Sequence, residues 1–254
     1  MTIKFIMISK NEIKWIKELH NKKYRHEEGL YLAEGSRLVL DLMQTKPEDV
    51  VMVTGTSLWA SKHATKLKEF SEQFKEIGGS DLGRIASLKS TDEVLGVFRF
   101  PVFSEISFKD NPISLYLDEV RDPGNLGTII RTADWFGVKE IFIAPGSVEP
   151  YNTKTIQASM SSIARVKVSE VDIEFLKEFI SYGILVGTAL EGKPFGQLKL
   201  DRPAIICLGN EAHGLSQPIV DQCQAMISIP SRSLGAESLN VAVSAGILLA
   251  YFCN

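Results

Sequence analysis

Side chains that could do chemistry occur in three separate segments of this chain, each with a β-rich run and a turn or helix start. The last segment runs from Ile227-Ser228-Ile229-Pro230 through Ser238-Leu239-Asn240 into the apolar run VAVSAGILLAYF. We expect a helix over 238–252 with Glu237 and Ser238 as its cap and first turn, because unpaired N–H groups at a helix start bind oxygen acceptors. Asn240 would then lie in the first turn, although Asn is a poor helix former. An ordinary capped core helix explains this segment as well as a binding site does.

An amide and a guanidinium stand out between residues 122 and 137. This segment follows the β-rich run ISLYLDEV and has apolar residues at helical spacing, at positions 126, 129, 130, 133 and 136. Asn125 is expected at the helix cap, and Arg131 lies outside the apolar stripe. An arginine in this place is either a structural ion-pair partner or a ligand for phosphate or carboxylate.

A carboxylate stands between two glycines in the remaining segment. The apolar strand predicted over 203–208 runs into Gly209, and Glu211 precedes Gly214. Ligands of α/β sheets bind beyond the carboxyl ends of the strands, so this turn is a candidate site. His213 adds an imidazole, the side-chain type that most often acts as a general base, and is an alternative catalytic group.

Composition limits the class of protein. The chain has 254 residues, 44% of them hydrophobic, which is enough for one large domain or two modest ones. No apolar run reaches the roughly 18–20 residues of a membrane helix, and the start MTIKFIMISK lacks a signal-peptide core. The cysteines Cys207, Cys223 and Cys253 have no metal-ligand spacing. We therefore expect reduced core thiols, no metal, no membrane partner and a cytoplasmic location.

Charge is distributed unevenly along the chain. The net charge is −3, but residues 1–26 hold seven Lys and Arg against two Glu, a local charge of +5 that leaves −8 for the remainder. A basic N-terminal segment on an acidic chain suggests a docking surface for phosphates. A solvated helix face is the alternative, since Glu12, Lys14, Lys17 and Glu18 also suit one.

Alternating helix and strand patterns predict two α/β domains. The polar stretch 104–112 is the expected linker, which gives domains of 1–104 and 105–254. In the first domain we expect helices over 11–22, 36–44 and 60–75 and strands over 29–34 and 49–55. In the second we expect strands over 113–120, 139–143, 165–168, 184–189, 203–208 and 226–229 and helices over 125–137, 152–162, 172–182, 215–222 and 238–252. Such alternation implies a mainly parallel sheet covered on both faces.

Taken together, the three segments resemble a known family. N-x-G-x-x-x-R at 125–131, L-G-N-E-x-x-G-L-S at 208–216 and I-P…E-S-L-N-V at 229–241 resemble the signature motifs of the SpoU (TrmH-like) RNA 2′-O-ribose methyltransferases. The run KYRHEEGLYLAEGSRLV at 23–39 is similar to the opening of the small substrate-binding domain of these enzymes. One departure is that the loop from Pro230 to Glu237 is one residue longer than the commonest family version, with Ser231 where methionine is frequent.

The resemblance implies a fold and a cofactor. The C-terminal α/β domain would thread a deep trefoil knot, preceded by a small α/β RNA substrate-binding domain. S-adenosyl-L-methionine would lie among three loops and be held mostly by backbone groups. The residues that the motifs place there are Thr188, Leu208, Gly209, Ile229, Pro230 and Leu239. Plain core packing explains the apolar members of this set equally well.

The resemblance also implies roles in methyl transfer to a ribose 2′-hydroxyl. Arg131 would bind the RNA phosphate and stabilise negative charge developing on the oxygen. Asn125 would orient Arg131 or the ribose, and Glu211 would hold its loop and pair with the arginine. Ser238 and Asn240 would shape the cofactor loop and touch the target nucleotide.

Partners and alternatives follow from the same comparison. The resemblance implies a homodimer, and the substrate-binding domain favours ribosomal RNA over tRNA as the substrate. A non-catalytic RNA-binding or assembly factor on the same fold is an alternative. A nucleotide-dependent enzyme on a doubly wound sheet would need G-x-G-x-x-G after its first strand, which D-P-G-N-L-G-T does not supply.

Overall fold

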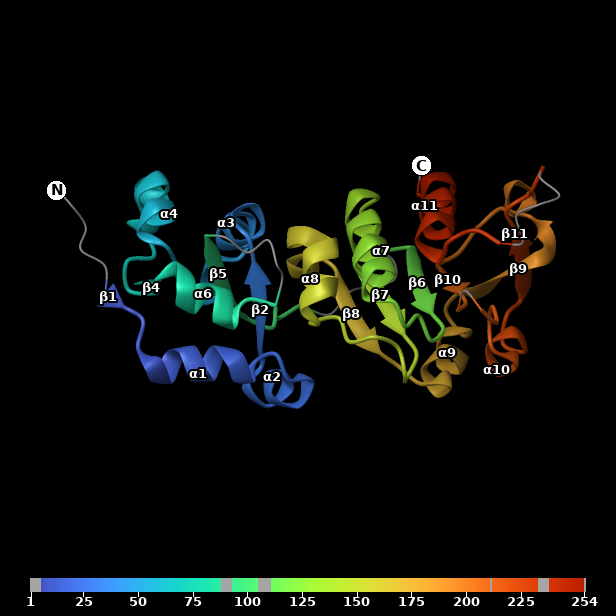
Figure 1. Cartoon of the computed structure of the whole chain (residues 1–254). Helices are drawn as coiled ribbons and strands as arrows, with labels where there is room; N and C mark the ends of the chain where they lie inside the picture. The colour runs from blue at the N-terminus through green and yellow to red at the C-terminus, as the bar shows by residue number, and fades with distance from the viewer. Residues whose placement is uncertain (1–5, 88–92, 105–110, 211, 233–237, 254) are drawn as a thin grey trace. The chain divides into compact units, whose positions relative to one another are not determined.

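The computed structural model of the chain describes residues 6–87, 93–104, 111–210, 212–232 and 238–253 (Figure 1). Two compact units account for them. Unit 1 combines Met1–Val102 with Tyr151–Ala164, and unit 2 combines Phe103–Pro150 with Arg165–Asn254. The predicted linker lies mostly outside the described residues, so the boundary at residue 104 stays a prediction. No helix in the described part of the chain has the length and apolar character needed to cross a membrane.

Unit 1 is built on a mixed five-stranded sheet with the strand order β1-β4-β3-β5-β2. The strands are β1 (Ile6–Met7), β2 (Leu30–Glu34), β3 (Val50–Gly55), β4 (Phe74–Glu76) and β5 (Val94–Arg99). β4 is parallel to both β1 and β3, whereas β5 is antiparallel to β3 and β2. Every residue of β2 is buried, including Glu34, whose carboxylate accepts from the amide and the hydroxyl of Ser87.

Helices surround this sheet. They are α1 (Lys10–Glu18), α2 (Lys22–Glu28), α3 (Ser36–Thr45), α4 (Ser57–Lys62), α5 (Ala64–Leu67) and α6 (Gly79–Ile85), with a 3₁₀ turn η1 (Pro47–Asp49). The prediction of one helix over 60–75 is wrong. The helical stretch breaks at His63, and the segment instead ends in β4, where Phe74 is buried. Burial of Phe74 between two strand partners outweighs the local helix propensity of this polar run.

One segment of unit 1 comes from the second half of the chain. α8 (Thr153–Ser159) packs against β2, and the 3₁₀ turn η2 (Met160–Ala164) packs against α3. At its start, the Tyr151 ring stacks on Phe100 with centroids 3.8 Å apart. The sequence predicted a short helix here but placed it in the second domain. Unit 1 therefore completes its core with residues that follow the first strands of unit 2.

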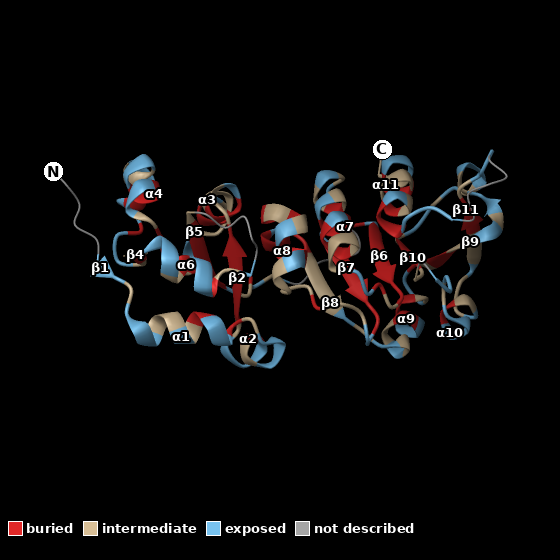
Figure 2. Ribbon diagram, in the orientation of Figure 1, coloured by how far each residue is buried: buried red, intermediate tan, exposed pale blue. Residues whose placement is uncertain are grey.

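Unit 2 contains a six-stranded sheet with the order β11-β9-β10-β6-β7-β8. The strands are β6 (Ile113–Leu117), β7 (Glu140–Ile143), β8 (Lys167–Glu170), β9 (Ile184–Pro194), β10 (Ala204–Leu208) and β11 (Ala225–Ser228). All neighbouring pairs are parallel, which confirms the predicted sheet type. The central strands β6 and β10 are buried throughout (Figure 2).

Helices cover both faces of this sheet (Figure 1). α7 (Pro123–Trp135) and α11 (Val241–Phe252) pack against each other on one side, and α9 (Ile173–Phe179) and α10 (Gln217–Val220) lie on the other. A short 3₁₀ turn, η3 (Phe195–Gln197), follows β9. On the α9 face, Leu176 and Ile219 join Tyr116 and Cys207 in one core cluster.

Two helix starts differ from their predictions. Asp122, not Asn125, is the N-cap of α7, because Pro123 suits the first helical position and the Asp122 carboxylate accepts from the Asn125 N–H. Helix α11 begins at Val241 rather than at Ser238, and Asn240 is its N-cap. Asn240 therefore does not lie inside the helix, where Asn is unfavourable, but at the cap, where Asn is among the preferred residues.

Candidate functional site

The predicted cofactor residues gather at the carboxyl edge of the sheet in unit 2. Leu208 ends β10, Thr188 lies level with it on the neighbouring strand β9, and Ile229 follows β11 on the far side of β9. The Thr188 hydroxyl donates a hydrogen bond of 3.0 Å to the Cys207 carbonyl, which ties the two strands at this level. Pro230 comes next and is exposed. The ends of β10 and β11 and the middle of β9 thus carry these four residues.

Strand β9 leaves its ladder with β11 at this edge. Met226 pairs with Gly187, but the next residue, Ile227, pairs with Lys193, so residues 188–192 form a bulge. The bulge returns at Gly192, where a Cβ would lie 2.4 Å from the Ile227 carbonyl carbon. A bulge of this kind turns side chains and backbone groups out of the sheet and is common beside active sites.

The loop after β10 folds back on itself. Asn210 and Gly214 form a bridge with backbone hydrogen bonds of 3.0 and 2.8 Å, and a Cβ on Gly209 would lie only 2.0 Å from the Gly214 carbonyl carbon. Glycine is therefore required at 209 by contact within the loop itself. Glu211 lies outside the described residues, and its predicted role stays a prediction. His213 is exposed.

The starts of α7 and α11 meet through their asparagines. Asn240 donates from Nδ2 to Oδ1 of Asn125 over 2.8 Å. Its own Oδ1 accepts from the backbone amides of Ala242 and Val243, which is the capping interaction. Asn125 lies in the first turn of α7, which begins at the carboxyl edge after β6. The structure thus joins two of the three sequence segments by a direct hydrogen bond.

Arg131 extends from α7 into solvent. It lies six residues after Asn125, about 9 Å further along the helix axis at about 1.5 Å rise per residue. Its side chain is exposed and makes no hydrogen bond or ion pair with any residue that the structure describes. The structural ion-pair interpretation therefore finds no support among those residues.

Ser238 and Leu239 precede the Asn240 cap and are both exposed. Leu239 is unusual, because a large apolar side chain is left 47% exposed. The longer loop falls largely in 233–237, which lies outside the described residues. The last loop therefore presents an apolar side chain and a hydroxyl immediately before the helix that Asn240 caps.

Two cysteines, Cys207 and Cys223, lie in the core cluster on the α9 face of the sheet. The pKa of Cys223 is lowered by a hydrogen bond from Cys207, whereas that bond and burial raise the pKa of Cys207. Both thiols are free. Within the described ranges, no three His, Cys, Asp or Glu side chains gather as a metal site would require.

S-adenosylmethionine combines an apolar adenine with polar ribose and amino-acid groups, and the residues at this edge fit it. The half-buried Ile229 and the exposed Leu239 offer apolar surface, whereas the side chain of Leu208 is buried in the sheet. Asn125 and Asn240 supply amide groups beside that surface. Adenine needs apolar faces and a few hydrogen bonds, which is the chemistry these loops provide.

Sequence reasoning missed two residues that organise this edge. Asp118 directly follows the buried strand β6 and accepts from the Ser216 amide, and Asn210 donates from its side chain to the Glu119 carbonyl. The usable signal was the position of Asp118, since a carboxylate directly after a fully buried parallel strand lies where α/β sheets hold ligands and loops.

Two family models match the chain, and together they cover most of it. Residues 112–250 match the model of the SpoU rRNA Methylase family, and residues 10–116 match the MRM3-like substrate binding domain. A Bacillus subtilis protein, the 23S rRNA (guanosine(2553)-2′-O)-methyltransferase RlmP, is 27% identical over 97% of this chain and 98% of its own length. An uncharacterised tRNA/rRNA methyltransferase from Synechocystis is 28% identical over 93% of this chain and 88% of its own.

Solved structures agree with these matches. A TrmH-family protein from Porphyromonas gingivalis superimposes with a TM-score of 0.82 and 32% identity, covering 96% of this chain and 97% of the other. The AdoMet-bound rRNA methyltransferase from Sinorhizobium meliloti gives a TM-score of 0.78 and 27% identity, covering 97% and 95%. With the SpoU model matching more than half of the chain, this protein belongs to the SpoU rRNA methylase family of S-adenosylmethionine-dependent RNA 2′-O-methyltransferases.

Proposed function

We propose that this protein methylates the 2′-oxygen of a ribose in ribosomal RNA. The observation that carries this proposal is the Asn125–Asn240 hydrogen bond, which brings the arginine helix and the last cofactor loop to one edge of the sheet. S-adenosylmethionine bound there would supply an activated methyl group. The protein would hold the ribose hydroxyl in line with that methyl group and exclude other orientations.

The exposed guanidinium of Arg131 suits two tasks in this reaction. It can bind a phosphate of the RNA in a bidentate manner, and it can stabilise negative charge that develops on the 2′-oxygen. Because a guanidinium keeps its proton in proteins, we assign charge stabilisation rather than proton abstraction to Arg131. Asn125 and Asn240 would hold the ribose and the cofactor loop in register.

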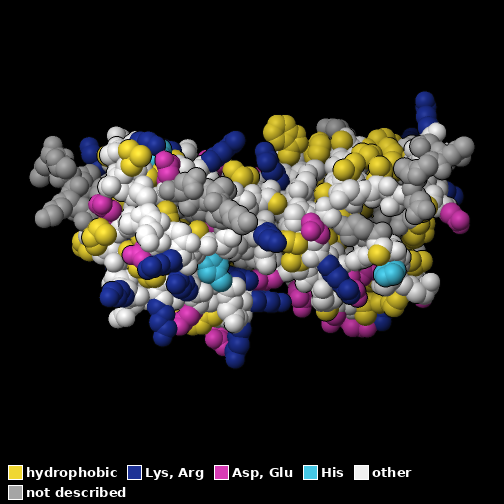
Figure 3. All heavy atoms as spheres, in the orientation of Figure 1, with side chains coloured by type: hydrophobic (Ala, Val, Ile, Leu, Met, Phe, Trp, Pro, Cys, Tyr) yellow, Lys and Arg dark blue, Asp and Glu magenta, His cyan; other side chains and the backbone are white. Residues whose placement is uncertain are grey.

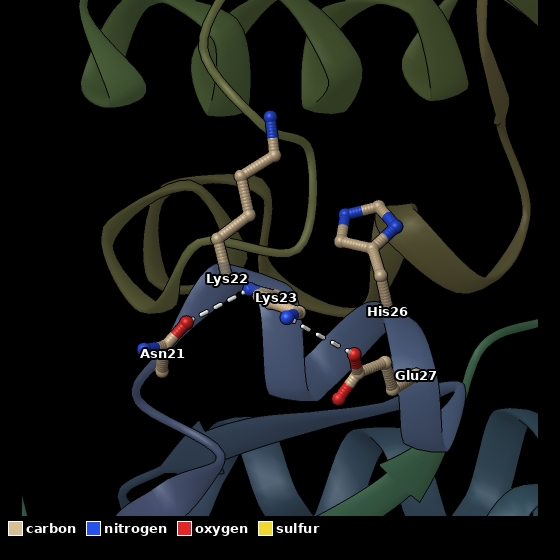
Figure 4. A pocket seen from close by; sticks show the side chains of 5 residues that line it. All are labelled: Asn21, Lys22, Lys23, His26 and Glu27. Carbon is tan, nitrogen blue, oxygen red and sulfur yellow. Dashed lines mark hydrogen bonds and ion pairs between the residues drawn. The ribbon is translucent and has the colours of Figure 1, made fainter.

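Ribosomal RNA is the proposed substrate because the similar proteins from Bacillus subtilis and Sinorhizobium meliloti carry that name, over nearly their full lengths. Unit 1 adds a basic surface. An open cavity of about 640 Å³ on α2 is lined by Asn21, Lys22, Lys23, His26 and Glu27 (Figure 4). Lys23 is paired with Glu27, whereas Lys22 has no partner among the described residues. We propose that this surface contacts RNA phosphates.

A homodimer is the proposed assembly. Hydrophobic side chains gather over α7 and α11 (Figure 3). Trp135 is 84% exposed, Val243 50% and Tyr251 43%, which is unusual for large apolar groups on two packed helices. A second copy of the chain would cover this face. The cytoplasmic location and the trefoil knot stay predictions.

Methyl transfer from labelled S-adenosylmethionine to unmodified ribosomal RNA and tRNA, measured in parallel, tests the proposal. We expect label in ribosomal RNA, and nuclease mapping should then locate one linkage made resistant by 2′-O-methylation. Label in tRNA alone would contradict the substrate. Absence of both label and cofactor binding would contradict the enzyme activity.

A further inference from the structure

Asp118 places a buried carboxylate beside the loop that follows β10 in the candidate site. It directly follows β6, and only 5% of its surface is exposed. Its backbone N–H donates to the Leu208 carbonyl over 2.9 Å, which continues the β6–β10 ladder by one bond. The Asp118 side chain is therefore held at the point where β10 gives way to its loop.

The Asp118 carboxylate binds the C-terminal end of the loop that follows β10. Asp118 Oδ2 accepts from the backbone N–H of Ser216 over 2.6 Å, a contact between residues 98 positions apart. Ser216 is the residue before α10, so this bond fixes where the loop ends and the helix begins. Hydrogen bonds to an ionised acceptor are shorter and about twice as strong as neutral ones.

Glu119, the next residue in the chain, binds the N-terminal end of the same loop. Glu119 has φ of 55°, a left-handed conformation that is uncommon outside glycine. Its carbonyl accepts from Nδ2 of Asn210 over 2.9 Å, and Oδ1 of Asn210 accepts from the Ala212 amide over 2.8 Å. A non-glycine residue in this conformation costs about 1 kcal/mol or more and persists only where its surroundings demand it.

We propose that Asp118 is a positioning residue for methyl transfer, which acts by holding the loop from Gly209 to Ser216 in the conformation that binds the cofactor. The inference rests on the proposed function. Asp118 and Glu119 clamp the two ends of the loop, while the Gly209–Gly214 contact closes its base. Asp118 itself touches neither cofactor nor RNA in this scheme.

The test compares Asp118→Ala, Asp118→Asn and a matched control, Asp172→Ala. Asp172 also accepts from a backbone amide, that of Phe175 over 3.1 Å, and caps the start of α9. It follows the edge strand β8, away from β10 and its loop. The readouts are S-adenosylmethionine affinity by calorimetry, kcat and KM on ribosomal RNA, and hydrogen exchange of the Ser216 amide in the full-length protein.

We expect Asp118→Ala to weaken cofactor binding about 10- to 100-fold and to raise the KM for cofactor in parallel. Exchange of the Ser216 amide should accelerate. Asp118→Asn keeps an acceptor oxygen and should recover most of the affinity, while Asp172→Ala should leave it within about twofold. Wild-type affinity and wild-type Ser216 exchange in Asp118→Ala would overturn the inference.

Different results would contradict the proposed function and the positioning role of Asp118. If the wild-type protein binds no cofactor and transfers no methyl group, the proposed function fails, whatever Asp118 does. If the wild type is active and Asp118→Ala loses thermal stability but keeps cofactor affinity and KM, Asp118 has only a structural role and the positioning inference is wrong. Equal loss in Asp118→Asn and Asp118→Ala, without faster Ser216 exchange, would also contradict it.

Discussion

Asn240 donates a hydrogen bond of 2.8 Å to Asn125, although 115 residues separate them in the chain. The same Asn240 side chain caps α11 through its oxygen. One amide group therefore does two things: it starts the last helix, and it fixes that start against α7. The polarity of the amide suits this, since its NH₂ donates and its oxygen accepts.

Replacing Asn240 with alanine should lower both stability and cofactor affinity. Loss of the cap costs about 1 kcal/mol, and loss of the bond to Asn125 frees the last loop. Asn152→Ala is the control, because Asn152 also caps a helix, α8, by accepting from the Lys154 amide. Both variants should melt earlier, but only Asn240→Ala should bind S-adenosylmethionine more weakly by calorimetry. Equal affinities would show that Asn240 acts only as a cap.

Arg131→Ala should reduce kcat about 100- to 1000-fold while sparing cofactor affinity, because it removes charge stabilisation on the 2′-oxygen. Single-turnover methylation and calorimetry measure the two quantities. Arg165→Ala is the control: Arg165 donates to Asp134 over 2.6 Å and should affect stability, not turnover. Wild-type turnover by Arg131→Ala would remove Arg131 from the catalytic assignment.

Gly209→Ala should disrupt the loop after β10. A Cβ there would lie 2.0 Å from the Gly214 carbonyl carbon. Because that atom belongs to the backbone, only a movement of the backbone could relieve the clash. We expect a loss of about 1–3 kcal/mol in stability and weaker cofactor binding, read from thermal unfolding and calorimetry. Gly196→Ala serves as the comparison, because a Cβ at Gly196 meets nothing within 4 Å. Similar behaviour of the two variants would contradict the close approach at Gly209.

Val243→Glu should weaken the proposed dimer, since a charge would be buried where two apolar faces meet. Sedimentation at several protein concentrations should show a larger monomer fraction than in the wild type. Tyr182→Glu provides the control, because Tyr182 is also exposed but lies outside α7 and α11. A wild-type protein that sediments as a monomer at all concentrations would refute the dimer itself.

Cys223 should be the most reactive thiol of the three. The hydrogen bond from Cys207 lowers the pKa of Cys223, whereas burial raises the pKa of Cys253. The thiolate is the nucleophile, so alkylation of Cys223 should begin at lower pH than that of Cys253. Peptide mass spectrometry after iodoacetamide treatment from about pH 6 to about pH 9 measures this order. Cys207→Ser removes the thiol partner and should change the alkylation profile of Cys223 more than that of Cys253.

Local pattern predicted most elements of unit 2. The β-rich runs at 113–120 and 203–208 became β6 and β10, and the apolar positions 126, 129, 130 and 133 became the buried side of α7. These features depend on periods of two and 3.6 residues, which are visible within a short window. The motif residues on these elements were named from the resemblance to the family, and the helix caps were misplaced by a few residues.

Elements whose neighbours are distant in sequence could not be predicted this way. β4 forms from a polar run because two strands from elsewhere pair with it, and β9 runs past its predicted end because β11 pairs with Lys193 and Pro194. Strand pairing depends on partners that no local window contains.

What the sequence by itself determined is therefore the family, the parallel α/β type of unit 2 and the identity of the motif residues, because these depend on residue type and short-range spacing. Only the tertiary structure decided that Asn240 bonds to Asn125, that Asp118 holds Ser216, and that Tyr151–Ala164 belongs to unit 1. Each of these is a contact across many residues of chain. Such contacts follow from strand order and helix packing, which are set by burial of the whole core rather than by any single segment.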